Sequence, residues 1–239
     1  THTGSSAASD VYKRQANDGV NGQELHYSQG DAFTTNMVKD IYPGLNNSSN
    51  PMWLSILGTE MIFSADDGEN GRELWITDNT EEGTRMIKDI NPGNNSSNPT
   101  GPMKEMGGYI YFSANDGTHG RELWRTDGTE AGTTLVRDIH EGENGSLSWG
   151  STAHWHGEYT MTHNGYFYFS ASDGESGEEL WRTDGTEEGT TMLVDANPGE
   201  VGSWPWWFST TDDKVYFTAW DGVSRELWYY WDNPGPIIS

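Results

Sequence analysis

Carboxylate side chains recur at one position of a repeated, glycine-rich turn. Each of these aspartates is followed directly by glycine: Asp18, Asp67, Asp116, Asp173 and Asp221. Carboxylates and backbone carbonyls in such loops are the hard oxygen ligands that calcium prefers. Asp-Gly is also a common pair in hairpin turns, and no loop follows the EF-hand spacing. The pattern therefore predicts either calcium sites or purely structural turns.

A second set of acids recurs in a Glu-Leu step, at Glu24, Glu73, Glu122, Glu179 and Glu226. Carboxylates can act as general acids and bases. Equivalent acids spread through a repeated array are more typical of structure, and we expect them to pair with backbone or arginine groups where repeats meet. The chain has no Ser/His/Asp order or phosphate-binding loop in a supporting context. We therefore expect that the protein is not an enzyme.

Three histidines form the other candidate metal site. His154 and His156 flank one residue, and His163 follows shortly after. On a strand, the period of two would place His154 and His156 on one face, as zinc or copper ligands require. Surface loops also carry histidines that bind nothing, so an ordinary loop is the alternative.

The tryptophans fall into two groups. Trp75, Trp124, Trp181 and Trp228 recur with the Glu-Leu step, so we expect them in the core. A second group does not recur and sits beside a turn, where flat aromatic faces could stack on sugar rings. This candidate carbohydrate patch consists of Trp204, Trp206 and Trp207. Packing at the edge of a repeat is the alternative.

Glycosylation sequons occur at the same point of three successive repeats. The acceptor residues would be Asn46, Asn47, Asn94, Asn95 and Asn144. Sequons alone are weak signals because Asn and Ser are ordinary loop residues. Their regular placement predicts one rim of the molecule on which glycans would lie.

The overall charge limits the choice of partners. Thirteen Lys and Arg against 37 Asp and Glu give a net charge of −24. Such a chain repels phosphate backbones and acidic lipid surfaces, so we expect no nucleic acid and no membrane insertion. The charge favours cations, among them calcium. There is no cysteine, which excludes disulfides and thiolate metal sites.

The spacing of the Glu-Leu step defines the fold. It recurs at residues 24, 73, 122, 179 and 226, so successive copies are 49, 49, 57 and 47 residues apart. The longest interval contains extra residues near 146–163. A fixed period of about 40–50 residues is the signature of propellers and other repeat arrays.

One repeat predicts four short strands. Residues 109–114 are aromatic and β-branched, a turn follows at 115–120, and further strands are expected at 122–126 and 133–139. A weaker strand near 102–106 precedes them. Four antiparallel strands in about 49 residues form a propeller blade. We therefore predict an all-β fold: a β-propeller of about five four-stranded blades, closed within one chain, over residues 16–239. Residues 1–15 do not match the repeat and are interpreted as a non-native or disordered segment.

Two of the copies carry a specific motif. Residues 122–129 and 179–186 both read Glu-Leu-Trp-Arg-Thr-Asp-Gly-Thr, which resembles the ELWxxDGT repeat. The resemblance covers residues 16 to about 232 and weakens at both ends, where His26 replaces tryptophan and residues 229–232 replace Thr-Asp-Gly-Thr. It implies a propeller-like fold in secreted or surface-attached bacterial proteins, and no activity is attached to the repeat.

These patterns together predict a function. We expect a non-enzymatic, extracellular structural or adhesive propeller module, which self-associates as an oligomer or as the subunit of a surface fibre. The alternative is a binding module for glycans or divalent cations. An enzyme with a histidine-based metal site near residues 154–163 is a third hypothesis.

Overall fold

The computed structural model describes residues 12–28, 35–147 and 160–231, and every regular element in these ranges is a β-strand. The strands form five antiparallel sheets. The first contains β1 (Tyr12–Asn17), β2 (Gln23–Ser28) and β3 (Asn36–Met37). The second contains β4 (Met52–Leu57), β5 (Glu60–Asp66), β6 (Arg72–Thr77) and β7 (Arg85–Lys88). The third contains β8 (Thr100–Met106), β9 (Tyr109–Asn115), β10 (Arg121–Thr126) and β11 (Thr134–Arg137). The fourth contains β12 (Thr160–His163), β13 (Tyr166–Ser172), β14 (Glu178–Thr183) and β15 (Thr191–Val194). The fifth contains β16 (Trp206–Thr210), β17 (Lys214–Trp220) and β18 (Arg225–Trp231).

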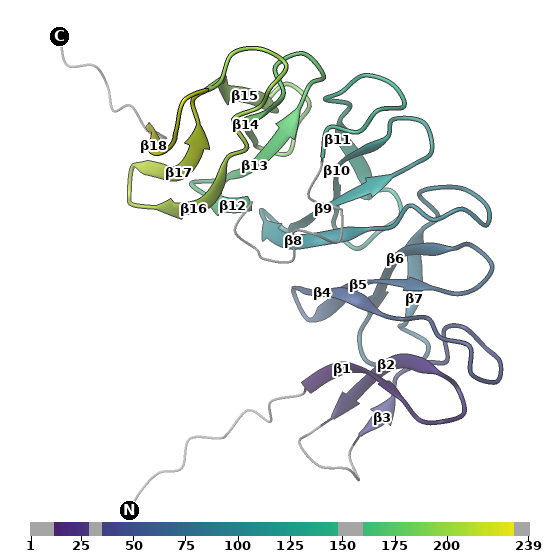
Figure 1. Ribbon diagram of the computed structural model, residues 1–239. Coiled ribbons are helices and arrows are strands. Elements are labelled where there is room, and N and C mark those ends of the chain that lie inside the picture. Colours follow the sequence, from purple (N-terminus) through teal and green to yellow (C-terminus); the bar gives the residue numbers. More distant parts are fainter. Residues whose placement is uncertain (1–11, 29–34, 148–159, 232–239) are drawn as a thin grey trace, which may run out of the picture.

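The sheets follow one another around an arc, like the blades of a propeller (Figure 1). The first strands of the second to fifth sheets contact each other in order: β4 meets β8, β8 meets β12, and β12 meets β16. These strands therefore form the inner side of the array. Each complete sheet follows the predicted blade order, so the all-β, propeller-like expectation is confirmed.

Two sheets differ from the expected blade, and ring closure is not confirmed. The first sheet has no described strand equivalent to β4, and the fifth has none equivalent to β7. The first and last sheets lie at opposite ends of the arc, and no described strand pairs across them (Figure 1). Residues 1–11 lie outside the described part of the chain. Residues 12–15, expected to lie outside the fold, belong to β1, which pairs with β2.

The core lies between successive sheets. Strand β9 buries Ile110, Tyr111 and Phe112 almost completely, because both of its faces are covered. The predicted core tryptophans follow the same rule, since Trp124 is only 6% exposed. The last sheet has a neighbour on one side only, and Trp228 there is half-buried.

Bulges shape three of the inner strands: β4, β8 and β16. The register of β4 against β5 shifts between Met52 and Ser55, and Trp53 there has a φ of 57°. A Cβ on Gly101 of β8 would lie 2.8 Å from a ring carbon of Trp53, so this ring packs against the next inner strand. The same bulge recurs in β16, where Trp207 has a φ of 58°. Among the described residues, no helix is long and apolar enough to cross a membrane.

Candidate functional site

Four of the recurring glutamates are completely buried between sheets. Glu73 on β6 represents the set. Its Oε1 accepts a hydrogen bond from the backbone N–H of Ser97 at 2.8 Å. Its Oε2 accepts from the Ser97 hydroxyl at 2.6 Å and from the N–H of Ile90 at 3.0 Å. The carboxylate thus holds the loop that leads from its own sheet into the next one.

The same arrangement recurs at each junction between neighbouring sheets. We call it the glutamate junction, and its pairs are Glu24–Ser49, Glu73–Ser97, Glu122–Ser146 and Glu179–Ser203. The serine also binds the following sheet, because the carbonyl of Ser97 accepts from the N–H of Asn115 at the end of β9. Each junction therefore links two sheets through one serine. Four of the five glutamates expected to be structural therefore lie at junctions, and their side-chain partner there is serine rather than arginine.

Burial sets the electrostatics of the junctions. Loss of solvation raises the pKa of Glu73 to about 7, against the hydrogen bonds from Ser97 and Ile90 that lower it. Burial also raises the pKa of Glu122 to about 7. Such groups would exchange protons near neutral pH. Both side chains are 0% exposed, so they are sealed from any substrate and serve to hold the sheets together.

The fifth glutamate lies in a different environment. Glu226 on β18 is exposed, and its Oε1 accepts a hydrogen bond from the hydroxyl of nearby Ser224 at 2.8 Å. In the earlier copies the partner is a serine 24 or 25 residues further along the chain. Among the described residues, Glu226 therefore occupies the position of a glutamate junction with Ser224 as its partner and no connecting loop.

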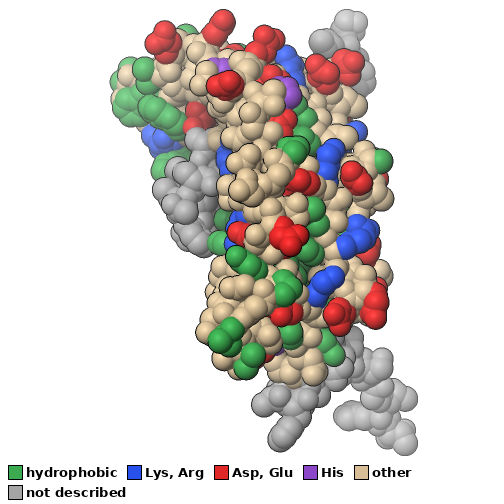
Figure 2. All heavy atoms as spheres, turned by 90° about the vertical axis from the view of Figure 1, so that its right-hand side faces the viewer, with side chains coloured by type: hydrophobic (Ala, Val, Ile, Leu, Met, Phe, Trp, Pro, Cys, Tyr) green, Lys and Arg blue, Asp and Glu red, His purple; other side chains and the backbone are tan. Residues whose placement is uncertain are grey.

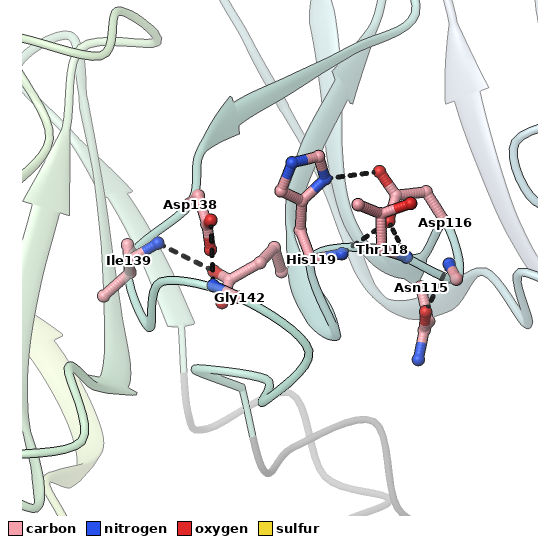
Figure 3. A network of polar contacts seen from close by, with 9 residues as sticks. Asn115, Asp116, Thr118, His119, Asp138, Ile139 and Gly142 are labelled. Atoms are coloured by element: carbon pink, nitrogen blue, oxygen red, sulfur yellow. Dashed lines mark hydrogen bonds and ion pairs between the residues drawn. The ribbon is translucent and has the colours of Figure 1, made fainter.

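The turn aspartates are occupied by their own turns. In Figure 3, Oδ1 of Asp116 accepts from the N–H groups of Thr118 and His119, both at 2.9 Å. Its Oδ2 lies 2.7 Å from Nδ1 of His119. Equivalent backbone bonds are formed by Asp18, Asp67, Asp173 and Asp221. The described residues contain no group of three or more His, Asp or Glu side chains that could hold a metal. The turns account for the recurrence of these aspartates, and calcium binding stays a prediction.

The predicted histidine site lies only partly within the described residues. His154 and His156 fall outside the described residues. His163 ends β12, and its Nε2 lies 3.0 Å from the amide nitrogen of Asn164. Among the described residues, His119, which sequence reasoning did not select, forms an ion pair with a carboxylate, that of Asp116. Its hydrogen bond with Asp116 raises the pKa of His119 above its ordinary value.

The tryptophans of the proposed sugar patch do not form one flat surface. The ring planes of Trp206 and Trp207 meet at 64°, and the guanidinium of Arg225 lies 4.5 Å from the centre of the Trp206 ring. Trp204 and Trp207 are 44% and 55% exposed. These residues lie where the fifth sheet ends the array, which agrees with the edge-packing alternative.

The regular sequons have a structural origin. The serines two residues after Asn47, Asn95 and Asn144 are the junction serines Ser49, Ser97 and Ser146. Sequence reasoning selected the asparagines and missed the serines. The signal that would have found them is their constant separation of 24 or 25 residues from the preceding glutamate. Asn46, Asn94, Asn95 and Asn144 are exposed and Asn47 is half-buried, so glycosylation stays a prediction.

Comparisons with known proteins bear on the fold. No family model and no curated protein matches the chain. A solved structure of puromycin hydrolase is 13% identical with a TM-score of 0.52, and the match covers 92% of this chain and 33% of that one. A prolyl endopeptidase structure is 12% identical with a TM-score of 0.48, covering 94% and 34% of the two chains. A TolB candidate from Agrobacterium tumefaciens is 12% identical with a TM-score of 0.38, covering 92% and 76%. The chain therefore spans about a third of the length of the first two proteins.

The comparisons overturn the predicted function. We expected a non-enzymatic, extracellular structural or adhesive module, which could be the subunit of a surface fibre, or alternatively a glycan- or cation-binding module. The similar structure with a TM-score above 0.5 instead belongs to an enzyme. At this identity the likeness defines the fold alone and gives no support to adhesion. Extracellular location, self-association and the ELWxxDGT resemblance stay predictions.

Proposed function

We propose that this chain serves as the propeller domain of a larger hydrolase, and that another part of that protein carries the catalytic centre. The proposal is supported by the likeness to puromycin hydrolase, which extends over 92% of this chain but only 33% of the hydrolase. A segment of that proportion is the size of a domain that accompanies a catalytic one.

The observation that carries the proposal is that the recurrent carboxylates accept hydrogen bonds from their own junctions and turns. The buried glutamates accept hydrogen bonds from junction serines, as Glu122 does from Ser146. The turn aspartates accept them from their own turns, as Asp116 does from Thr118. General acid–base catalysis needs a carboxylate or imidazole that can reach a substrate proton. In the described ranges these acids hold sheets and turns, so the domain would frame a site rather than perform the reaction.

Sequencing the complete transcript tests this proposal first. We expect the reading frame to continue into a region with a nucleophile, a histidine and a carboxylate in a catalytic order. The purified chain alone should not hydrolyse aminoacyl anilides or react with a fluorophosphonate probe, whereas the complete product should do both. A transcript that encodes only repeats, or turnover by the chain alone, would contradict the proposal.

A further inference from the structure

The face of the fifth sheet that points away from the fourth sheet lacks, within the described residues, the contacts that every earlier sheet makes with the next one. We call it the open face. Leu74, Leu123 and Leu180 are 0% exposed, whereas the equivalent Leu227 is 70% exposed. Tyr229 and Trp231 share this face and are 58% and 51% exposed. Alternate residues of β18 therefore present an apolar surface to solvent.

At the earlier junctions, the corresponding face is covered by residues of the next sheet. Each buried leucine clusters with a phenylalanine and an alanine two residues apart on the second strand of the next sheet. The sets are Leu25 with Phe63 and Ala65, Leu74 with Phe112 and Ala114, Leu123 with Phe169 and Ala171, and Leu180 with Phe217 and Ala219. A matching partner for Leu227 would thus be a strand that carries Phe-x-Ala.

Three further features of the fifth sheet point to the same partner. Glu226 occupies the junction position but is exposed, whereas Glu179 is buried against Ser203. Trp207 lies at the same bulge position as Trp53. The ring of Trp53 packs on Gly101 of the next inner strand, whereas Trp207 is 55% exposed. Within the described residues β18 pairs only with β17, whereas β6, β10 and β14 each pair with a fourth strand on their other edge.

We propose that the open face of the fifth sheet docks a further repeat of this same kind, joined directly after β18. That repeat would add the outer strand beside β18, a serine on Glu226, an inner strand against Trp207, and Phe-x-Ala on Leu227. A second copy of this chain fits less well. Arg14 occupies the phenylalanine position in the first sheet of such a copy. This follows from the register: Arg14 is opposite His26 in the first sheet, and Phe63 is opposite Trp75 in the second. The first sheet also has no described inner strand.

An extended chain tests the inference. Residues 184–231 are repeated directly after Trp231, in place of residues 232–239. We expect the amide hydrogens of β18 to exchange about tenfold more slowly or better, and the melting temperature to rise. In the matched control, the added residues that correspond to Ser203 and Phe217 are both alanine. This control should lose most of the added protection of the β18 amides from exchange.

A second variant separates docking from general stabilisation. Leu227→Ser should leave the parent chain unchanged but lower the melting temperature of the extended chain, and Leu180→Ser should destabilise both. Exchange in β18 that is no slower in the extended chain overturns the inference, including the case in which the added repeat stays unfolded. Concentration-dependent dimers of the parent chain with protected β18 amides would also overturn it, in favour of a second copy. The inference does not rest on the hydrolase proposal, because every residue added comes from this chain.

Discussion

At the scale of single residues, the junction serine has more contacts than its small side chain suggests. Its hydroxyl and N–H reach the glutamate of one sheet, and its carbonyl accepts from the next sheet. A buried carboxylate costs free energy unless hydrogen bonds compensate it, so removing one donor leaves a penalty rather than merely a lost contact.

We therefore expect Ser146→Ala to lower the free energy of unfolding by about 1.5–3 kcal/mol, the range for hydrogen bonds to charged groups. Ser146 is 2% exposed and bonds Glu122 through both its hydroxyl and its N–H. Ser224→Ala is the matched control, because its hydroxyl bonds an exposed glutamate, and it should cost less than about 0.5 kcal/mol. Urea unfolding followed by tryptophan fluorescence measures both, and equal costs would contradict the role of the junction.

The raised pKa values of Glu73 and Glu122 predict a pH dependence of stability. Both rise from 4.5 to about 7 in the folded state because of burial. The folded protein therefore holds these protons more tightly than the unfolded chain. Their contribution is full below pH 4.5 and is lost as the pH rises through about 7, by roughly 3 kcal/mol per glutamate.

The turn aspartates act in the opposite direction at lower pH. Backbone hydrogen bonds from Ser224 and Val223 lower the pKa of the turn aspartate Asp221, so the contribution of such groups is lost as the pH falls below 3.8. We expect maximal stability between these windows, close to pH 4.5. Melting temperatures from pH 3 to 8 test this, and Glu122→Gln should flatten the decline above pH 4.5. Stability that rises steadily towards pH 8 is the opposite result.

At the scale of elements, the strands could be predicted because repetition averages out local ambiguity. The apolar run at residues 109–112 gives a strand covered on both faces, and the structure has it as part of β9. The junction could not be predicted in the same way. Glu122 and Ser146 lie 24 residues apart in sequence, and only the path of the loop brings them into contact. The sequon pattern also drew attention to Asn144 instead of Ser146.

The periodic and non-periodic tryptophans should differ in their effect on stability. Trp124 is 6% exposed between two sheets, so Trp124→Ala should cost about 3–5 kcal/mol through lost burial and a cavity. Trp204 is 44% exposed at the end of the array, so Trp204→Ala should be mild. Thermal unfolding compares them, and small, equal shifts would remove the distinction between core and edge.

The glycine that ends four of the five aspartate turns should tolerate no side chain; these residues are Gly22, Gly71, Gly120 and Gly177. Gly71 has a φ of 69°, and a Cβ there would lie 2.4 Å from the backbone oxygen of Asn95 in the junction loop. Gly58 has a φ of 60° with nothing within 4 Å of such a Cβ. Gly58→Ala should cost about 1–2 kcal/mol for its backbone conformation alone. Gly71→Ala should cost clearly more, because the junction loop must also move. Chemical denaturation measures the free energy of unfolding of both variants. Equal losses would mean that the backbone conformation alone sets the cost.

At the scale of the whole molecule, like charge opposes the compact state. The net charge is −24, and Figure 2 shows Asp and Glu side chains spread over the outer side of the arc, with Lys and Arg among them. Folding brings these charges closer together, which salt screens over about 10 Å at 0.1 M ionic strength.

We expect the melting temperature to rise with added salt, and to rise further with calcium or magnesium at equal ionic strength. The reason is that divalent ions concentrate near an acidic surface more strongly than monovalent ions do. Melts in calcium, magnesium, sodium chloride and chelator measure the effect. A rise confined to calcium would indicate a specific site, and identical midpoints throughout would remove cations from the account.

The number of sheets was predictable from the period, but the ends of the array were not. Each sheet is covered on one face by the sheet that follows it. The repeat pattern therefore predicts that both Leu123 and Leu227 are buried, but Leu227 is 70% exposed. Sequence periodicity describes a position within a repeat. It does not record whether a neighbouring repeat is present to cover it.

The glutamate junction also gives the array a direction. At every contact the earlier sheet contributes the carboxylate and the later sheet contributes the serine. One end of the arc therefore presents an acceptor, Glu226, and the opposite end presents none of this kind among the described residues. Two identical ends cannot satisfy each other, because two carboxylates would meet without donors. This contact consequently cannot build a twofold-symmetric dimer, and any growth of the array through it is unidirectional.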